Sequence, residues 1–119
     1  MQSFRLYYWD FPESLHNQVG GWTINQNGSL TVLIDSLLPA DKQRFYLKHE
    51  LAHIVLDHMN KAIPKNSEIV GGCWLISDAW EAEANKYAEQ MTDEELNQLM
   101  QYAKEIRSIC VPAEVYENI

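Results

Sequence analysis

The chain has 119 residues, of which 46% are hydrophobic and 22% are charged, and 17 acidic against 9 basic side chains give a net charge of −8. This size and composition predict one folded domain over residues 1–119. The acidic balance argues against a nucleic-acid-binding surface and against adhesion to anionic membranes, because both require clustered Lys and Arg. A chain with two cysteines, no signal-like N-terminus and no long apolar run is expected to be cytoplasmic and without disulfides.

The first third of the chain favours β-structure. Residues 4–9 are aromatic and extended in character. The dipeptide Asn27-Gly28 tolerates the positive φ angles of a tight hairpin turn, and apolar residues alternate with other residues through the segment 29–35 that follows it. We therefore expect a β-hairpin over about residues 21–35.

The middle of the chain predicts a helix over about residues 43–59, which contain neither Gly nor Pro. Pro39 lies where a helix can begin, and Asp41 places negative charge near the positive end of the helix dipole. Four apolar side chains fall near one helical stripe: Leu47, Leu51, Ile54 and Val55.

Two more helices are expected in the last third. Ser77 is a suitable N-cap for a helix that runs to about Met91, and the capping-box sequence that begins at Thr92 starts another. The expected core face of that last helix is Leu96, Leu99, Met100, Ala103 and Ile106. Strands first and helices afterwards indicate an α+β fold, with a hairpin or small antiparallel N-terminal sheet followed by three helices.

Residues 49–53 read HELAH, which is the HExxH pattern, inside the first expected helix. Histidines four residues apart project from one helical face, so the rings of His49 and His53 can both reach one metal ion. Glu50 points along the neighbouring edge of that face, where it can reach a water on the ion and act as a general base. The pattern therefore predicts a zinc site with two histidine ligands and a catalytic glutamate.

A catalytic zinc needs a third protein ligand, and the second expected helix offers Glu81 and Glu83. The two carboxylates lie roughly 200° apart around a helix of 3.6 residues per turn, so both cannot bind one ion. Glu81 shares a face with Asn85, one turn further along. Chance produces HExxH in only about one such sequence per hundred, which favours a real metal site. The alternative is a helix whose histidines bind no metal.

Other polar residues near the motif have simpler interpretations. Cys73 is an alternative ligand, of the kind that favours a closed structural site. Asp57 is expected to be exposed near the helix end rather than to orient a ligand histidine, and His58 suits the negative end of the helix dipole. Two tyrosines near the motif, Tyr46 and Tyr87, are expected to pack in the core rather than to stabilise an oxyanion.

HELAH together with the downstream segment EAEAN resembles the ImmA/IrrE family of bacterial and mobile-element metallopeptidases, which belong to the gluzincin class. The resemblance covers about residues 30–91 and implies that Glu81 is the third zinc ligand, with Asn85 as a supporting polar residue. The chain departs from the family after this segment, because it reads EQMTD where a Leu-Leu-Met-Pro-like stretch is common. Nor is there room for the helix-turn-helix domain of many members, so regulation is expected to act by cleavage or contact.

The resemblance implies a zinc metalloendopeptidase acting on a regulatory protein, such as a repressor or antitoxin-like partner. Zn²⁺ held by His49, His53 and Glu81 would activate a water, and Glu50 would take its proton and pass it to the leaving amine. We expect an extended substrate to pair with the edge of the strand at residues 30–35. The alternatives are a non-catalytic zinc-binding regulatory domain and a small helical interaction module that binds no metal.

Overall fold

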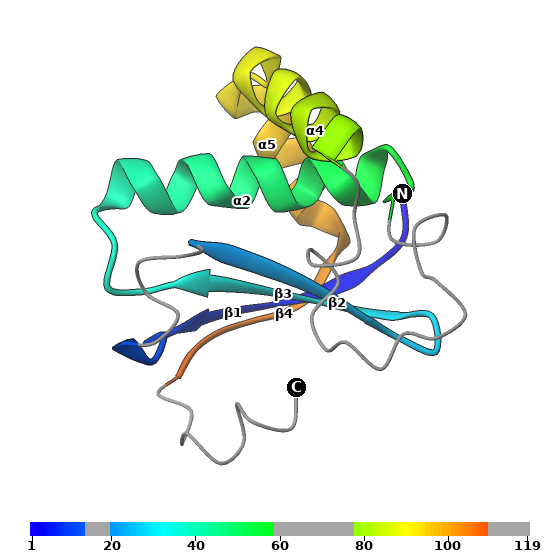
Figure 1. Cartoon of the computed structure of the whole chain (residues 1–119). Helices are drawn as coiled ribbons and strands as arrows, with labels where there is room; N and C mark the ends of the chain where they lie inside the picture. Colours follow the sequence, from blue (N-terminus) through cyan, green and yellow to red (C-terminus); the bar gives the residue numbers. More distant parts are fainter. Residues whose placement is uncertain (14–19, 59–77, 110–119) are drawn as a thin grey trace.

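The computed structural model describes residues 1–13, 20–58 and 78–109, which form a four-stranded sheet with helices over one face (Figure 1). The strands run in the order β2-β3-β1-β4 across the sheet. Their bounds are β1 Phe4–Trp9, β2 Gly21–Gln26, β3 Ser29–Asp35 and β4 Ala103–Ile109. The α+β class expected from the sequence is confirmed.

The expected hairpin is present with the expected turn. Strands β2 and β3 pair antiparallel from Gly21 opposite Ile34 to Gln26 opposite Ser29. Between them Asn27 has a φ of 54° and Gly28 a φ of 88°, which is the left-handed backbone that a two-residue hairpin turn requires. The turn therefore aligns β2 and β3 as the local sequence predicts.

The sheet is mixed, which corrects the expected antiparallel arrangement. Strand β1 pairs parallel with β3 on one side and parallel with β4 on the other. Strands β1 and β4 come from opposite ends of the described chain, so no local sequence pattern announces their pairing. Strand β1 therefore lies inside the sheet, with both of its sides hydrogen-bonded.

The third expected helix is much shorter than predicted. Helix α5 spans Asp93–Leu99 and begins at Thr92, whose hydroxyl accepts a hydrogen bond from the Glu95 amide at 3.1 Å. A 3₁₀ turn, η2, follows at Met100–Tyr102, and the chain then enters β4. Ala103 and Ile106 therefore lie in a strand, and Ile106 is 55% exposed instead of buried. Pairing with β1 outweighs the helical spacing of these apolar residues.

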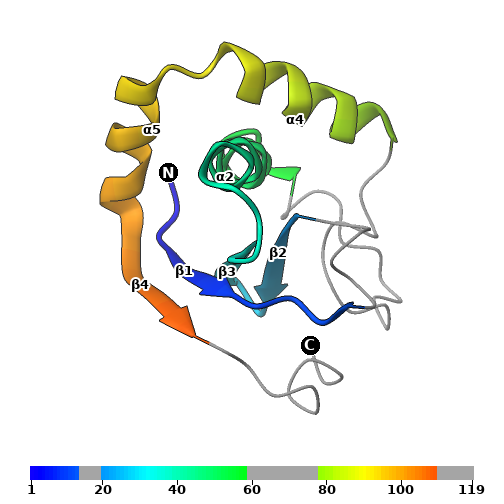
Figure 2. The same cartoon turned by 90° about the vertical axis from the view of Figure 1, so that its left-hand side faces the viewer.

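The helices form two further layers over the sheet (Figures 1 and 2). Helix α2 spans Ala40–Val55, with Pro39 at its N-cap position and Asp41 in its first turn. It lies against the sheet, while α4, Asp78–Gln90, lies on its other side and α5 lies beside it, leading to β4. The predicted cap Ser77 lies outside the described residues. Because α2 lies between the sheet and α4, three of its polar residues, His49, Glu50 and His53, are buried.

The core divides between the two faces of the sheet. The larger cluster fills the space between the sheet and the helices and contains Phe4, Leu6, Leu30, Val32, Ile34, Leu47, Leu51, Ile54, Met91 and Leu96. A smaller cluster is formed by Trp9, Phe11, Trp22 and Leu33. Trp9 and Leu33 alternate with the residues of the larger cluster along β1 and β3. This two-sided burial follows from the period of two along each strand.

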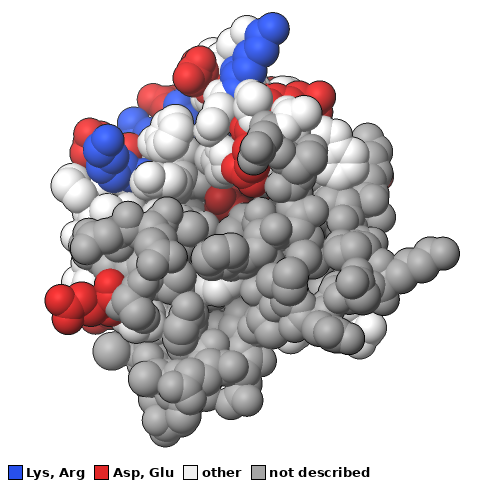
Figure 3. Space-filling model, in the orientation of Figure 1, with Lys and Arg blue, Asp and Glu red and all other residues white. Residues whose placement is uncertain are grey.

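The described surface carries charges of both signs over the helices (Figure 3). Arg44 and Lys48 of α2 form ion pairs with Asp93 at 3.5 and 3.2 Å. Across the described parts of the chain, no helix combines the length and the apolar character needed to span a membrane.

Candidate metal site

Helix α2 carries the HExxH residues on its buried side. His49, Glu50 and His53 are 8%, 2% and 0% exposed. The rings of His49 and His53 meet edge to face with their centroids 4.7 Å apart, and their Nε2 atoms are 3.1 Å apart. The one-turn spacing of the sequence thus brings two imidazole nitrogens to the same point, as predicted.

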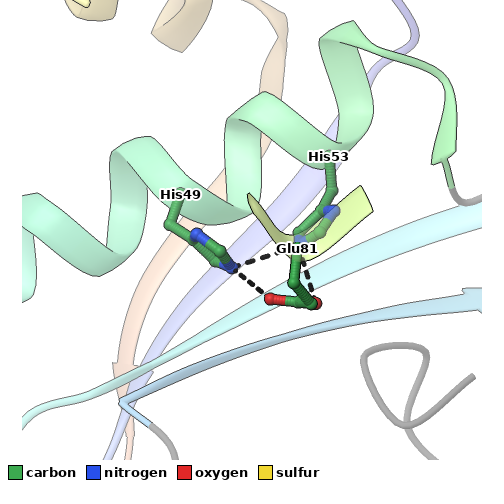
Figure 4. Close-up of side chains that lie close together, drawn as sticks. All are labelled: His49, His53 and Glu81. Carbon is green, nitrogen blue, oxygen red and sulfur yellow. Dashed lines mark hydrogen bonds and ion pairs between the residues drawn. The ribbon is translucent and has the colours of Figure 1, made fainter. Parts of the chain in front are cut away.

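Glu81 of α4 completes this group (Figure 4). Its Oε2 lies 3.0 Å from Nε2 of His49, and its Oε1 lies 3.1 Å from Nε2 of His53. One ligand atom from each of the three residues falls within 4.8 Å of the other two. Glu83 points elsewhere, because its Oε1 lies 2.8 Å from Nε2 of His58. The geometry therefore selects Glu81 rather than Glu83 as the partner of the two histidines.

This group of donors fits a metal ion. Oε1 of Glu81 is buried yet has no hydrogen-bond partner of good geometry among the described residues. A buried, unsatisfied carboxylate oxygen is costly unless a cation or donor meets it. Two imidazoles and one carboxylate are also the ligand set of many catalytic zinc sites. His49, His53 and Glu81 can therefore hold a metal ion.

Without a metal ion, the surroundings of Glu81 and His49 favour a negative charge on Glu81 and a positive charge on His49. Burial tends to raise the pKa of Glu81, but its hydrogen bond to His49 and its attraction to both histidines outweigh burial and lower that pKa to about 2. Burial tends to lower the pKa of His49, and its hydrogen bond to Glu81 with the charges of Glu50 and Glu81 raises it overall. Asn85, one turn beyond Glu81, also contributes to the raised pKa of His49. Glu81 is thus held as a carboxylate, whose negative charge a bound cation would balance.

Glu50 lies beside the group rather than in it. Its Oε1 accepts a hydrogen bond from the Thr23 hydroxyl at 2.7 Å, while its Oε2 is 3.9 Å from Nε2 of His49. Burial is the largest influence on Glu50, and it raises the pKa of this carboxyl despite the nearby histidines and Thr23. A raised pKa makes a carboxylate a better proton acceptor than an ordinary exposed one.

Strand β2 shapes the space around Glu50, and sequence reasoning did not identify this. A Cβ on Gly21 would lie 3.0 Å from Cγ of Glu50 and 3.2 Å from Cδ1 of Ile34. Gly21 therefore lets β2 approach the helix closely at this point. The adjacent Gly20-Gly21 pair is the only signal in the sequence that could have indicated this approach.

His58 is the clearest residue whose place the sequence did not predict. We expected it at the end of the helix, facing the dipole, but it is 1% exposed, and its Nδ1 lies 2.9 Å from Nδ1 of His53. Asp57 is exposed, as expected. The position of His58 five residues after the second motif histidine was the available signal. Cys73 lies outside the described residues.

The aromatic residues near the motif behave as expected. Tyr46 and Tyr87 pack against the larger core cluster, between the sheet and the helices. The Tyr87 hydroxyl also donates a hydrogen bond to Glu95 at 2.9 Å.

The expected substrate edge is wrong. Strand β3 is hydrogen-bonded to β2 on one side and to β1 on the other, so its backbone has no free edge for a peptide. Among the described strands the outer ones are β2 and β4, and β2 is the one whose residues contact Glu50.

One of three comparisons with known proteins finds a match, and it is to a protein family. No curated protein and no solved structure matches the chain. The family profile described as Peptidase_M78, IrrE N-terminal-like domain, matches residues 13–114, which include all the residues of the site. The match confirms the resemblance seen in the sequence and indicates a metallopeptidase. The chain therefore belongs to the Peptidase_M78 family of IrrE N-terminal-like domains.

Proposed function

We propose that this protein is a zinc-dependent metalloendopeptidase that cleaves a regulatory protein. The observation that carries the proposal is the convergence of His49, His53 and Glu81 within 4.8 Å, beside the buried carboxylate of Glu50. Membership of a peptidase family supports a peptide bond as the substrate. A cytoplasmic repressor or antitoxin-like protein of a mobile element is the partner we propose.

Zinc bound to His49, His53 and Glu81 would polarise the peptide carbonyl and lower the pKa of a water molecule toward about 7. Glu50 takes the proton from the attacking water and delivers it to the amine as the C–N bond breaks. Thr23 holds Oε1 of Glu50, which leaves Oε2 on the side of His49 to exchange this proton. The new C–O bond ends in a carboxylate product.

The substrate, in this proposal, pairs with β2. Gly21 and Thr23 of this outer strand lie against Glu50, so a peptide added alongside β2 would pass close to the base. The Glu50→Gln variant with a bound peptide tests this by hydrogen exchange. A peptide that slows amide exchange in β2 more than in β4, relative to the peptide-free variant, supports the placement. A peptide that slows exchange only in β4 contradicts it.

Peptide cleavage by the Glu50→Gln variant tests the function. A library of peptides from a bacterial proteome, incubated with the zinc-loaded chain and analysed by mass spectrometry, does not require the substrate to be known. Removing the general base should slow cleavage by about 10²–10⁴-fold while zinc is retained. Glu89→Gln, an exposed position of the same helix as Glu81, is the matched control.

The outcomes separate the proposed activities. Equal cleavage by parent and Glu50→Gln contradicts the mechanism. A parent that binds zinc and cleaves neither the library nor co-expressed candidate regulators favours the non-catalytic regulatory domain instead.

A further inference from the structure

His58 lies directly behind His53, on the side away from Glu81. Helix α2 ends at Val55, and Asp57 then adopts a left-handed conformation with a φ of 62°, its amide donating to the Ile54 carbonyl at 3.1 Å. This backbone reversal is a common way to end a helix. It returns the chain toward the last turn, so the ring of His58 packs inward instead of pointing to solvent.

The His58 ring is held by a stacking contact on one face and by a contact at each of its two nitrogens. Trp80 of α4 stacks on it with an interplanar angle of 4° and centroids 5.0 Å apart. Its Nδ1 lies 2.9 Å from Nδ1 of His53, and its Nε2 lies 2.8 Å from Oε1 of Glu83. Glu83, His58 and His53 are thus joined by consecutive hydrogen bonds, which lead from α4 to the Nδ1 side of His53.

The chemistry of these groups gives the hydrogen bonds a direction. A carboxylate can only accept, so Nε2 of His58 carries the hydrogen that faces Glu83. In a neutral imidazole the other nitrogen then accepts, so Nδ1 of His53 must donate to it. Hydrogen on Nδ1 of His53 is the arrangement in which Nε2, the atom that faces His49 and Glu81, can offer the lone pair that binds a metal ion.

We propose that His58 and Glu83 are positioning residues that fix the tautomer and the ring orientation of His53, so that its Nε2 is always ready to bind the metal. The proposal rests on the proposed metal site. Helix α4 then contributes twice, with Glu81 at the site and Glu83 through His58. Neither His58 nor Glu83 belongs to the group that converges on the ion.

The tautomer of His53 in the metal-stripped full chain is the first test. Long-range ¹H–¹⁵N correlation spectra distinguish hydrogen on Nδ1 from hydrogen on Nε2, and single His variants assign the rings. We expect hydrogen on Nδ1 of His53 in the parent and a mixed population, with and without hydrogen on Nδ1, in Glu83→Ala. A parent whose His53 carries hydrogen on Nε2 and none on Nδ1 overturns the proposal.

Zinc affinity, measured by competition with a chromophoric chelator, is the second test. Removing such an outer partner typically weakens metal binding by about 10–100-fold, and we expect this loss for Glu83→Ala. Glu83→Gln keeps an acceptor and should recover part of the affinity, and His58→Asn should bind zinc more tightly than His58→Leu. Glu89→Ala, at another exposed position of α4, should equal the parent.

These measurements fail separately from the proposed function. Equal zinc affinities for Glu83→Ala and Glu89→Ala overturn the positioning role while the peptidase proposal stands. A parent that binds no zinc overturns the peptidase proposal, and the tautomer of His53, read without metal, still decides the positioning role.

Discussion

Thr23 controls the proposed base through one buried hydrogen bond, 2.7 Å long. Thr23→Val removes the donor that favours the charged carboxylate, so the pKa of Glu50 should rise further. Because the base must be ionised to accept a proton, the acidic limb of the cleavage profile should move to higher pH. An unsatisfied buried oxygen also costs about 1–3 kcal/mol, measurable by urea unfolding.

Thr31→Val, on the neighbouring strand, is the control for losing a hydroxyl from the sheet. An acidic limb that does not move in Thr23→Val would contradict the role of Thr23.

Glu81 and His49 predict how the stability of the metal-free protein depends on pH. Folding lowers the pKa of Glu81 from 4.5 to about 2, so its contribution is present above pH 4.5 and is lost as the pH falls toward 2. Folding raises the pKa of His49 above 6.5, so its contribution is complete below pH 6.5 and is lost as the pH rises through the raised value. Both contributions are present together between pH 4.5 and 6.5.

Urea unfolding of the metal-free parent and of Glu81→Gln, compared across this pH range, measures the effect. The stability advantage of the parent should be largest between pH 4.5 and 6.5, with Glu89→Gln tracking the parent. An advantage that is the same at every pH would show that the two side chains are not paired by charge.

The residues of the site differ in how far sequence could predict them. His49, Glu50 and His53 follow from the helical period alone, because one helix carries all three. Glu81 required the family pattern, since helical spacing separates it from Glu83 without choosing between them. The position of His58 depends on a left-handed residue after the helix, which no periodicity reveals.

At the scale of elements, α5 and β4 show where local pattern reaches its limit. The capping sequence at Thr92 correctly starts a helix. Beyond Leu99 the apolar spacing still fits a helix, yet the chain forms a strand because β1 offers a side for backbone hydrogen bonds. That pairing joins residues from opposite ends of the described chain, and it also makes the sheet mixed.

Two glycines of the β2-β3 hairpin should respond differently to alanine. A Cβ on Gly28 meets open space, but its φ of 88° makes alanine strained, so Gly28→Ala should cost about 1–2 kcal/mol and leave cleavage unchanged. A Cβ on Gly21 would lie 3.0 Å from Cγ of Glu50. Gly21→Ala should therefore displace the base and reduce the cleavage rate while zinc stays bound.

Unfolding curves, cleavage rates and zinc content of the two variants check this contrast. Full activity in Gly21→Ala would show that β2 does not set the position of Glu50.

At the scale of the whole molecule, the site joins two layers of the fold. Helix α2 supplies two of the proposed ligands from against the sheet, and α4 supplies the third from the layer above (Figure 2). Zinc that binds only the folded chain should add about 4 kcal/mol of stability at a thousandfold excess over its Kd. Thermal unfolding should thus shift downward after chelation in the parent, and much less in Glu81→Gln. Identical unfolding with and without chelator would mean that no metal links these layers.

Zinc content per chain, measured by elemental mass spectrometry, tests the central claim most directly. The purified parent and Glu89→Gln should each carry about one zinc ion per chain, and Glu81→Gln should lose most of it because one of three protein ligands is gone. A parent without metal even after zinc is supplied would contradict the metal site, and the HELAH segment would then be an ordinary helix of an interaction module.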